Sequence, residues 1–408
     1  MKIAHIVRRF SRAEWGGTET VVTALAREQR ARGHDPRVFC TDALQDGAAG
    51  GADASRVARF GYFYPYWPLS KAARRALDKK GGNPFAFGLF RAVAAWRPDV
   101  IHVHAGGRLA ACAVRLGERL GAPTAISLHG GAAVVPKEEL EQMLRPLRHT
   151  LPYGGVLDRI LGLRFDPLAR SRAVLALSRA EVARLKARYP KQRIEHFPNG
   201  IDVWGQEGPE GLERREGTER REGRAPFARL LCVSRIDYQK NQLALLDLLA
   251  AEPACALTLV GPVTADWYAA KVRARAKALG LEGRVTLVPG LPPDSPRLAE
   301  AYAAADVFVL PSLHEPFGIV ALEAMRAGLP LLAANVGGLP DFVKDGENGL
   351  LFDPSRPETL VAAYRRLTPA CAARLAANGR ATAAAYAWPA LAERLTALYR
   401  DLVGGARR

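Results

Sequence analysis

The sequence contains little cysteine and no long apolar run. Five cysteines are scattered along the 408 residues without a CxxC pair: Cys40, Cys112, Cys232, Cys255 and Cys371. Such spacing does not suggest a disulfide scaffold or a cysteine-rich metal site, and a reducing cytoplasm is the expected compartment. No stretch approaches the roughly 18 apolar residues that a membrane span requires. The opening residues, MKIAHIVRRF, lack the apolar segment of a secretory signal and are typical of a buried strand.

Acidic residues are also too few to balance the basic ones. The formal net charge is +17, from 58 Lys and Arg against 41 Asp and Glu. The basic residues are spread along the chain, without interleaved stacking aromatics or zinc-finger spacing, so nucleic acid is not an expected partner. An anionic ligand, an anionic membrane face, or the compositional bias of an Arg-rich and Ala-rich sequence would each account for the charge.

The length favours two domains, and 49% hydrophobic with 24% charged residues suits a globular protein. Short apolar runs alternate with helical patterns, such as residues 18–32, where Val21, Val22 and Leu25 recur at helical spacing. The predicted strands are residues 3–7, 38–40, 100–103, 125–128 and 174–177, and then 230–233, 257–260, 285–288, 307–310 and 331–333. This alternation predicts an α/β fold in which helices cover both faces of a parallel sheet in each half.

A charged segment separates the two halves. Residues 205–224, GQEGPEGLERREGTERREGR, contain no aromatic residue and one large aliphatic one, and the unit ERREG occurs twice. Such a segment buries no core, and we expect a linker or surface loop over residues 201–227. The predicted domains are residues 1–200 and 228–387, with a last helix, 388–408, that crosses back to the first. Ligands bind beyond the carboxyl ends of strands in such sheets, so two facing halves would bind one in the cleft between them.

The stretch HEPFGIVALEAMRAGLP places two carboxylates around a helix start. Residues 307–310 form the preceding strand, and the helix begins near Gly318, where backbone N–H groups of Phe317, Gly318 and Ile319 favour an anion such as phosphate. Glu315 and Glu323 need partners other than a phosphate, and hydroxyl groups of a ribose and of a transferred sugar would serve. The alternative is that Glu323 bridges locally and Glu315 is solvated.

Two other segments offer groups for a diphosphate. Arg235 and Lys240, in VSRIDYQKN, follow a predicted strand, and a guanidinium fork with an ammonium suits a diphosphate, although a surface ion pair is the alternative. Gly16 and Gly17, in EWGGT, form a strand-to-helix turn whose N–H groups could contact a phosphate or sugar. The turn is not GxGxxG, and by itself it is a common feature.

Together these segments resemble a known family. Glu315, Phe317, Gly318 and Glu323 look like the E-x7-E motif of retaining GT-B glycosyltransferases of family 4. GGTETVV, SRIDYQKN, PNGID and NVGGLPDFVKDGENGLLFDP resemble that family's first loop, diphosphate-binding segment, interdomain hinge and closing motif. The resemblance implies two Rossmann-like domains that face each other across a cleft.

The resemblance also implies roles for individual residues. Arg235 and Lys240 would hold the diphosphate and stabilise its charge as it leaves, Glu315 would contact the donor sugar, and Glu323 would bind the ribose. Gly16 and Gly17 would lie near the phosphates. His129, in SLHGG, matches the histidine that borders the reacting sugar; the alternative is a structural histidine bonded to backbone. Backbone groups near Pro289, Gly290 and Leu291 would recognise the base.

The implied activity is transfer of a sugar from a nucleotide-diphosphate sugar, with a UDP-sugar favoured over a GDP-sugar, to a glycan, glycolipid or small glycoside, without a cofactor or metal. His102 and His104 share a strand face, but no local carboxylate or cysteine completes a metal site with them. A UDP-sugar 2-epimerase of the same fold and a non-catalytic glycan-binding relative are the alternatives.

The acceptor side of the sequence contains two unusual segments. The segment of residues 62–90 mixes aromatic and basic residues, and the segment of residues 131–164 is unusually long. Both lie in the half where this family binds acceptors. They could meet a lipid-linked acceptor at the inner face of an anionic membrane, or be an ordinary helix with a basic solvated face.

Overall fold

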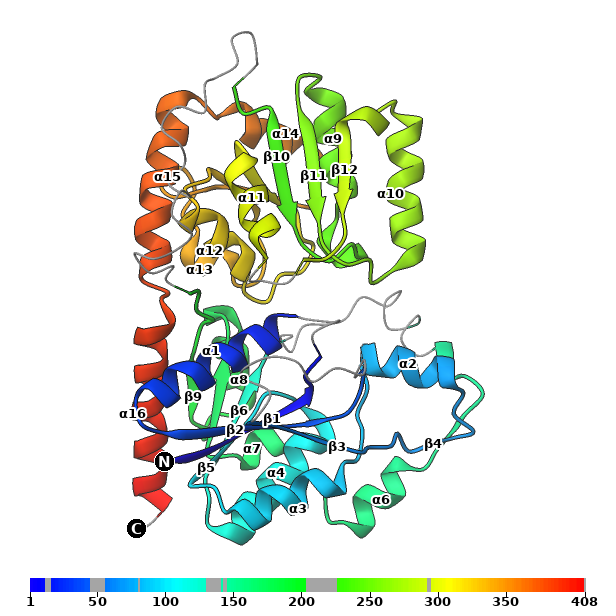
Figure 1. Cartoon of the computed structure of the whole chain (residues 1–408), viewed down its shortest axis with the longest axis vertical. Coiled ribbons are helices and arrows are strands. Elements are labelled where there is room, and N and C mark those ends of the chain that lie inside the picture. The colour runs from blue at the N-terminus through cyan, green and yellow to red at the C-terminus, as the bar shows by residue number, and fades with distance from the viewer. Residues whose placement is uncertain are drawn as a thin grey trace. The chain divides into compact units, whose positions relative to one another are not determined.

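The computed structural model describes residues 1–11, 16–44, 56–79, 81–129, 141, 145–202, 226–291 and 295–406. The charged segment of residues 205–224 lies outside this range. The chain forms two compact units, shown in Figure 1: unit 1 comprises Met1–Pro198 with Trp388–Arg408, and unit 2 comprises Asn199–Ala387. Each is an α/β body with its own parallel sheet, as the alternating sequence pattern predicts.

Unit 1 contains a seven-stranded sheet in the order β3-β2-β1-β5-β6-β8-β9, and all of its pairings are parallel. The strands are β1 (Lys2–Arg9), β2 (Asp35–Thr41), β3 (Val57–Phe60), β5 (Val100–Val103), β6 (Thr124–Leu128), β8 (Ala173–Ala176) and β9 (Ile194–His196). A separate antiparallel pair joins β4 (Tyr66–Trp67) to β7 (Leu151–Pro152). The central strands are buried on both faces, which explains their continuous apolar runs.

Helices cover both faces of this sheet; in Figure 1, α1 lies on one face and α3 and α4 on the other. They are α1 (Gly17–Ala31), α2 (Lys71–Lys79), α3 (Phe87–Trp96), α4 (Gly107–Leu120), α6 (Gly154–Ile160), α7 (Pro167–Arg170) and α8 (Arg179–Arg188), with the 3-10 turn η2 (Arg145–Leu147). α1 spans nearly the residues that its helical spacing predicts, and Val21, Val22 and Leu25 are buried.

The last helix, α16 (Trp388–Ala406), belongs to unit 1 although it follows unit 2 in the sequence. It packs beside α1, and the Arg32 guanidinium donates a hydrogen bond to the Pro389 carbonyl at 2.7 Å. Trp388 and Tyr399 are fully buried, so apolar packing holds the helix in this unit.

Unit 2 contains a six-stranded parallel sheet in the order β12-β11-β10-β13-β14-β15. Its strands are β10 (Arg229–Val233), β11 (Ala256–Val260), β12 (Val285–Val288), β13 (Val307–Leu310), β14 (Leu331–Ala334) and β15 (Leu350–Phe352). Its helices are α9 (Leu243–Ala251), α10 (Asp266–Ala278), α11 (Pro296–Ala304), α12 (Ile319–Arg326), α13 (Leu339–Phe342), α14 (Pro357–Arg365) and α15 (Pro369–Ala384), with the 3-10 turns η3 (Tyr238–Lys240) and η4 (Glu282–Arg284).

The sequence misses three strands of the two sheets, and all three lie at a sheet edge: β3, β9 and β15. An edge strand pairs on one side only, is short, and carries a weaker apolar pattern than a central strand. None of the helices in the described part of the chain combines the length and the apolar character of a membrane span.

Candidate functional site

The carboxyl ends of β10 and β13 lie side by side in unit 2, because these two strands pair in register. The loop after β10 contains η3, and its Gln239 carbonyl accepts a hydrogen bond from the Leu313 N–H at 2.8 Å. The two loops that carry Lys240 and Glu315 are thereby joined, as expected for parallel strands that end at one edge.

Lys240 and Glu315 form a direct ion pair at this edge. The Lys240 ammonium lies 2.6 Å from a Glu315 carboxylate oxygen, and the side chains are only 13% and 9% exposed. The Ser312 hydroxyl donates to the same oxygen at 3.2 Å. Glu315 is therefore not solvated, and its partner in this structure is a cation; the predicted contact with sugar hydroxyls remains a prediction. The carboxylate fixes the ammonium at a defined place beside the start of α12.

Arg235 is more accessible than Lys240. Its side chain is 40% exposed, with the guanidinium 3.8 Å from an Asp237 carboxylate oxygen. The Gln242 side chain donates to the Arg235 carbonyl at 2.8 Å, and this hydrogen bond fixes the backbone. A fixed backbone with an exposed guanidinium is suited to an incoming anion.

α12 begins at the predicted place. Gly318 occupies its N-cap position with φ 98°, in the left-handed region that glycine tolerates, and supplies no side-chain cap. Phe317 is buried, with its ring against those of Phe342 and Tyr386. Ile319 is the first helical residue, so the backbone N–H groups of the first turn carry the partial positive charge that favours an anion.

Two glycines of the closing motif shape the same loop. Gly337 has φ 59°, and a Cβ there would overlap the Glu315 carbonyl oxygen. A Cβ on Gly338 would overlap the Pro316 carbonyl oxygen, and the Gly338 N–H donates to the Glu315 carbonyl at 3.0 Å. Sequence reasoning did not assign these residues a role in the site; the GG pair in NVGGLP was the available signal.

Glu323 lies within α12, and its carboxylate accepts a hydrogen bond from the buried Tyr302 hydroxyl at 2.9 Å. Burial raises the pKa of Glu323, while the hydrogen bond from Tyr302 and the charge of Arg326 oppose this shift. Glu323 therefore has a local partner, as the alternative of local bridging expects. One of its carboxylate oxygens is occupied by Tyr302.

The segment Pro289, Gly290 and Leu291 follows β12, two strands away from β10. A Cβ on Gly290 would press against Pro262, and one on Gly261 would overlap the Ser234 carbonyl oxygen. The loops after β10, β11 and β12 are thus in contact, which places the predicted base-recognition segment on the same sheet edge as Arg235.

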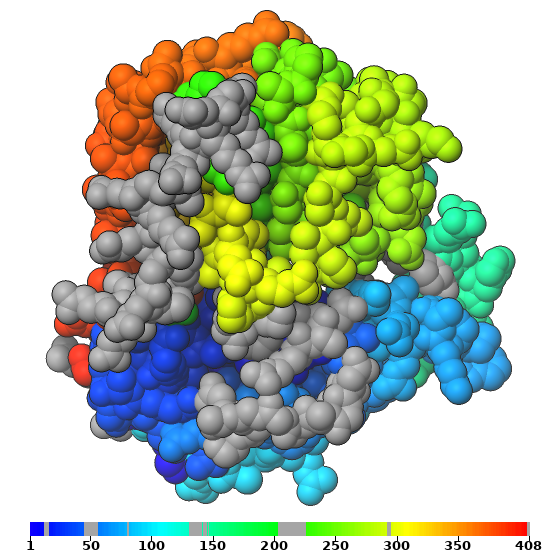
Figure 2. Space-filling view, turned by 45° about the horizontal axis from the view of Figure 1, so that its top comes forward, coloured from blue at the N-terminus to red at the C-terminus, as the bar shows by residue number. Residues whose placement is uncertain are grey.

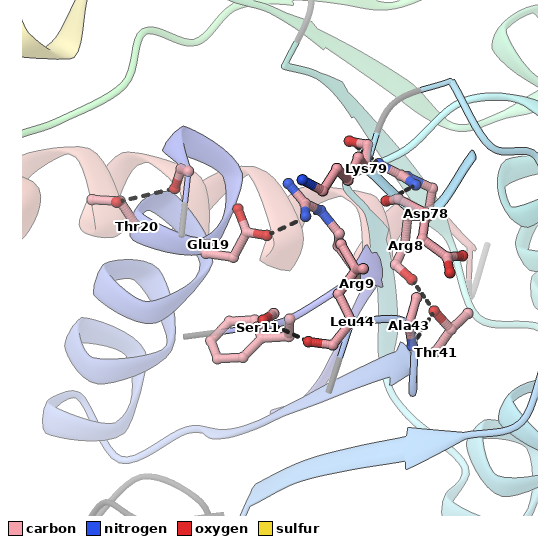
Figure 3. Close-up of polar contacts among 12 residues, drawn as sticks. Arg8, Arg9, Ser11, Glu19, Thr20, Thr41, Ala43, Leu44, Asp78 and Lys79 are labelled. Carbon is pink, nitrogen blue, oxygen red and sulfur yellow. Dashed lines mark hydrogen bonds and ion pairs between the residues drawn. The ribbon is translucent and has the colours of Figure 1, made fainter. Parts of the chain in front are cut away.

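In unit 1, Gly16 and Gly17 lie where β1 leads into α1. Gly16 is the N-cap residue and Gly17 the first helical residue; Glu14 and Trp15 of this motif lie outside the described residues. The buried Glu19 carboxylate lies 3.8 Å from the Arg9 guanidinium, as Figure 3 shows. Burial raises the pKa of Glu19, and Arg9 opposes this shift.

Arg8 also lies at the end of β1 and was not predicted to contribute. Its guanidinium donates to the carbonyls of Leu77 at 3.0 Å and Asp78 at 2.7 Å, at the end of α2 (Figure 3). The basic pair Arg8 and Arg9 directly after an apolar strand was the sequence signal. The carbonyl dipoles at the end of α2 favour the cation of Arg8, so this residue ties β1 to α2.

His129 lies at the carboxyl end of β6, and its ring contacts a row of other histidines. The His129 Nε2 lies 2.8 Å from the His104 Nδ1, and the His104 Nε2 lies 2.9 Å from the His5 Nδ1. The alternative of a histidine bonded to backbone is not what these contacts show, because the partner of His129 is another imidazole. Its role at the reacting sugar remains a prediction.

Three histidines lie close enough to raise the question of a metal. Ring nitrogens of His5, His102 and His104 come within 4.8 Å of one another, and all three residues are buried. Yet every one of their six ring nitrogens already has a hydrogen-bond partner. For His102 these partners are the Tyr399 hydroxyl at 2.5 Å and the Ser127 hydroxyl at 2.7 Å. Hydrogen bonding thus accounts for the cluster, and we assign it no metal.

Comparisons with known proteins agree with this geometry. The family model described as glycosyl transferases group 1 matches residues 218–380, and that described as glycosyltransferase family 4 matches residues 15–204. A D-inositol 3-phosphate glycosyltransferase of Nocardiopsis dassonvillei is 31% identical over 411 residues, covering 94% of this chain and 89% of that protein.

Among solved structures, a sucrose-phosphate synthase of Thermosynechococcus elongatus has a TM-score of 0.72 at 24% identity and covers 99% of each chain. Anabaena Alr3699/HepE, in complex with UDP and glucose, has a TM-score of 0.69 at 20% identity and covers 98% of this chain and 100% of its own. These structures are GT-B glycosyltransferases, so the fold that the sequence motifs imply is confirmed.

Proposed function

This chain belongs to the family 4 glycosyltransferases, and from that premise we propose that it transfers a sugar from a nucleotide-diphosphate sugar to a hydroxyl acceptor, retaining the anomeric configuration and needing no metal ion. The observation that carries the proposal is the Lys240–Glu315 pair beside the uncapped start of α12. It supplies a fixed cation and oriented N–H groups where a leaving diphosphate would need them.

The mechanism follows from charge. Cleavage of a sugar–phosphate bond develops positive charge on the sugar and negative charge on the diphosphate. Lys240, Arg235 and the N–H groups at Ile319 would stabilise the negative charge without reorganising, and stabilisation by such preorganised groups is usually the largest single contribution to catalysis. Glu315 would neutralise and aim Lys240 before substrate arrives and offer its remaining oxygen to the donor sugar. The unoccupied side of Glu323 would bind the ribose.

The other predicted contacts complete the proposal. Backbone groups of Pro289, Gly290 and Leu291 would recognise the base, and Gly16 and Gly17 the phosphates. His129 would contact the transferred sugar. UDP is the favoured nucleotide, which the UDP in the Anabaena structure supports. D-inositol 3-phosphate, named for the Nocardiopsis relative, is the first small acceptor to test beside glycans and glycolipids.

A binding and turnover experiment tests this function. We expect one nucleotide among UDP, GDP and ADP to raise the melting temperature most, because a ligand that binds only the folded state stabilises it by mass action. The matching nucleotide sugars, incubated with candidate acceptors and EDTA, should then give a glycoside of unchanged anomeric configuration by NMR. Inversion, an acceptor-independent epimer, or complete inhibition by EDTA would contradict the proposal.

We also propose that unit 1 contacts an anionic membrane through one surface, here called the β4–α6 surface. Its apolar part consists of large side chains that are unusually exposed: Trp67 (69%), Leu151 (70%), Val156 (60%) and Ile160 (72%). Trp67 and Leu151 are directly opposite each other in the β4–β7 pair. Val156 and Ile160 lie four residues apart and so share one face of α6.

Basic residues lie near this apolar part. α2 follows β4 closely, contacts η2, and exposes Lys71, Arg74 and Arg75. In Figure 2, α2 and the segment around α6 lie together on one side of unit 1. Within residues 56–79 and 145–164 the only acidic residues are Asp78, which is buried, and Asp158, which pairs with Arg108 at 2.9 Å. Exposed apolar groups with basic residues nearby suit an anionic bilayer surface.

Vesicle co-sedimentation tests this contact. We expect binding to vesicles that contain anionic lipid, weaker binding at high salt, and a loss of at least tenfold on Trp67→Ser with Ile160→Ser. Leu287→Ser, at an exposed position in unit 2, is the matched control and should bind normally. Equal binding to neutral vesicles, or an unchanged affinity of the double variant, would refute the contact.

A further inference from the structure

Four side chains of unit 1 form one continuous hydrogen-bonded row. A Gln29 amide oxygen lies 2.8 Å from the His5 Nε2, the His5 Nδ1 lies 2.9 Å from the His104 Nε2, and the His104 Nδ1 lies 2.8 Å from the His129 Nε2. Gln29 is on α1, His5 on β1, and His104 and His129 directly follow β5 and β6. The row therefore runs from a fully buried amide to the carboxyl edge of the sheet.

The histidines of this row are neutral around neutral pH. Burial lowers the pKa of His5 and of His129 to about 4 each, and lowers that of His104 further below its usual value. His5 and His104 are also nearly inaccessible to solvent. Among the described residues no carboxylate forms a hydrogen bond or ion pair with these rings; their partners are one another and the Gln29 amide.

Neutral imidazoles that are hydrogen-bonded in a row must all donate their N–H in the same direction along it. Each has one N–H donor and one lone-pair acceptor, so the partner at one end fixes the tautomer of every ring. The Gln29 amide oxygen only accepts, so His5 donates from Nε2 and accepts at Nδ1. His104 then donates from Nε2 and accepts at Nδ1, and His129 donates from Nε2. The Nδ1 of His129 is left as a lone pair.

The orientation of the Gln29 amide decides this direction, because a flipped amide would reverse every tautomer. In the structure the Gln29 amide oxygen faces the His5 Nε2 at 2.8 Å, and the Gln29 amide nitrogen is buried without a hydrogen-bond partner among the described residues. Among the residues that the structure describes, the His129 Nδ1 has no hydrogen-bond partner, and it is buried.

We propose that Gln29, His5 and His104 are positioning residues that hold His129 in its Nε2–H tautomer and present the lone pair of its Nδ1 to a hydroxyl group of the substrate. The inference rests on the proposed function for the identity of that substrate as a sugar or its acceptor. It explains why a glutamine is buried on α1, and why one histidine lies on β1 and another directly after the neighbouring strand β5. The three residues act through His129 and do not touch the substrate.

The tautomer of His129 is directly measurable by NMR in protein labelled with ¹⁵N-histidine. Long-range ¹H–¹⁵N correlation spectra distinguish a protonated Nδ1 from a protonated Nε2, and His129→Gln identifies the signal. In the wild type we expect Nε2 protonated and Nδ1 unprotonated. In Gln29→Met, which removes the acceptor, we expect a mixture of tautomers, and in Gln29→Glu, which keeps an acceptor, the wild-type tautomer. A protonated Nδ1 in the wild type, or an unchanged tautomer in Gln29→Met, overturns the proposal.

Two matched variants separate positioning from simple loss of stability. His104→Leu interrupts the row, whereas His102→Leu removes an equally buried histidine that bonds to Tyr399 and Ser127 outside it. Both should lower the melting temperature. His104→Leu and Gln29→Met should lower kcat at least tenfold, on the scale of acid–base contributions, with the KM for the nucleotide sugar unchanged. His102→Leu should keep kcat within about threefold.

The outcomes distinguish the two proposals. Equal losses of kcat in the two leucine variants would show that the row acts only structurally. If the wild type transfers no sugar from any nucleotide sugar, the proposed function fails, whereas the tautomer measurement still decides the orientation of His129. A fixed tautomer without turnover would leave the substrate identity wrong and the positioning right.

Discussion

The two sheet edges that carry candidate residues differ in the charge of the groups that hold those residues in place. The edge of unit 2 uses charge: Lys240 and Glu315 pair at 2.6 Å beside a helix start, and Arg235 is exposed. The edge of unit 1 also carries the Arg9–Glu19 ion pair, but its His129 is held by neutral groups: the row from Gln29 to His129 carries no charge, and each link is a hydrogen bond. A charge site holds an anion through attraction, whereas a neutral row fixes which atom of a ring carries a proton. Polar groups at the edges of two similar sheets can therefore serve either to hold an anion or to fix the position of a proton on a ring.

The largest effect should come from breaking the charge site. Lys240→Ala removes a cation from the diphosphate and should lower kcat by about 10²–10³-fold, the size of a lost oxyanion contact. It also leaves Glu315 buried without its cation, which costs on the order of 3–5 kcal/mol of stability. Steady-state kinetics and thermal unfolding measure the two effects.

The double variant Lys240→Met with Glu315→Gln separates the loss of kcat from the loss of stability. It removes both charges together, so we expect the melting temperature to recover while kcat stays low. Arg275→Ala, which breaks an exposed pair with Asp247, is the control and should change neither quantity. Recovery of kcat in the double variant would show that Lys240 serves the fold and not the transferred group.

The next effect concerns the backbone that supports the charge site. Gly337→Ala would place a Cβ against the Glu315 carbonyl at a positive φ, and we expect a loss of about 2–4 kcal/mol in the free energy of unfolding. Gly280→Ala has a similar φ of 66° with open space around it, so it should lose only about 1 kcal/mol. Chemical denaturation compares the two; equal losses would mean that the close approach at Gly337 does not matter.

The smallest effect concerns Glu323. Glu323→Gln keeps an acceptor for Tyr302 but removes the charge, and we expect the KM for the nucleotide sugar to rise by about tenfold, the equivalent of 1.4 kcal/mol.

The pKa of Glu323 is higher in the folded protein than in the unfolded chain, so the folded state binds more protons. The free energy of unfolding should therefore fall as the pH rises from the unfolded pKa through the folded one. The Gln variant should lack that dependence; a wild type without it would contradict the buried carboxylate.

The sequence predicted the helix and strand bounds around the candidate residues of unit 2, but not the contacts between side chains in either unit. Strand β13 has the predicted bounds, and α12 begins after Gly318 as expected, because apolar runs and a glycine at a strand-to-helix turn are local signals. The pairing of Lys240 with Glu315 was not predicted, since it joins residues 75 positions apart. His102 and His104 were noticed as a pair on one strand, but their partners His5, Tyr399 and Ser127 come from other elements.

By itself the sequence determined the alternation of strands and helices, the two-part organisation, and the motifs around Glu315 and Arg235, because these depend on short-range periodicity and spacing. Only the tertiary structure decided which polar groups meet. His5 lies beside His102 because β1 and β5 pair in parallel register, and His104 reaches His5 across 99 residues of sequence. Hydrogen bonds between neighbouring strands depend on strand order and register, which no single stretch of sequence encodes.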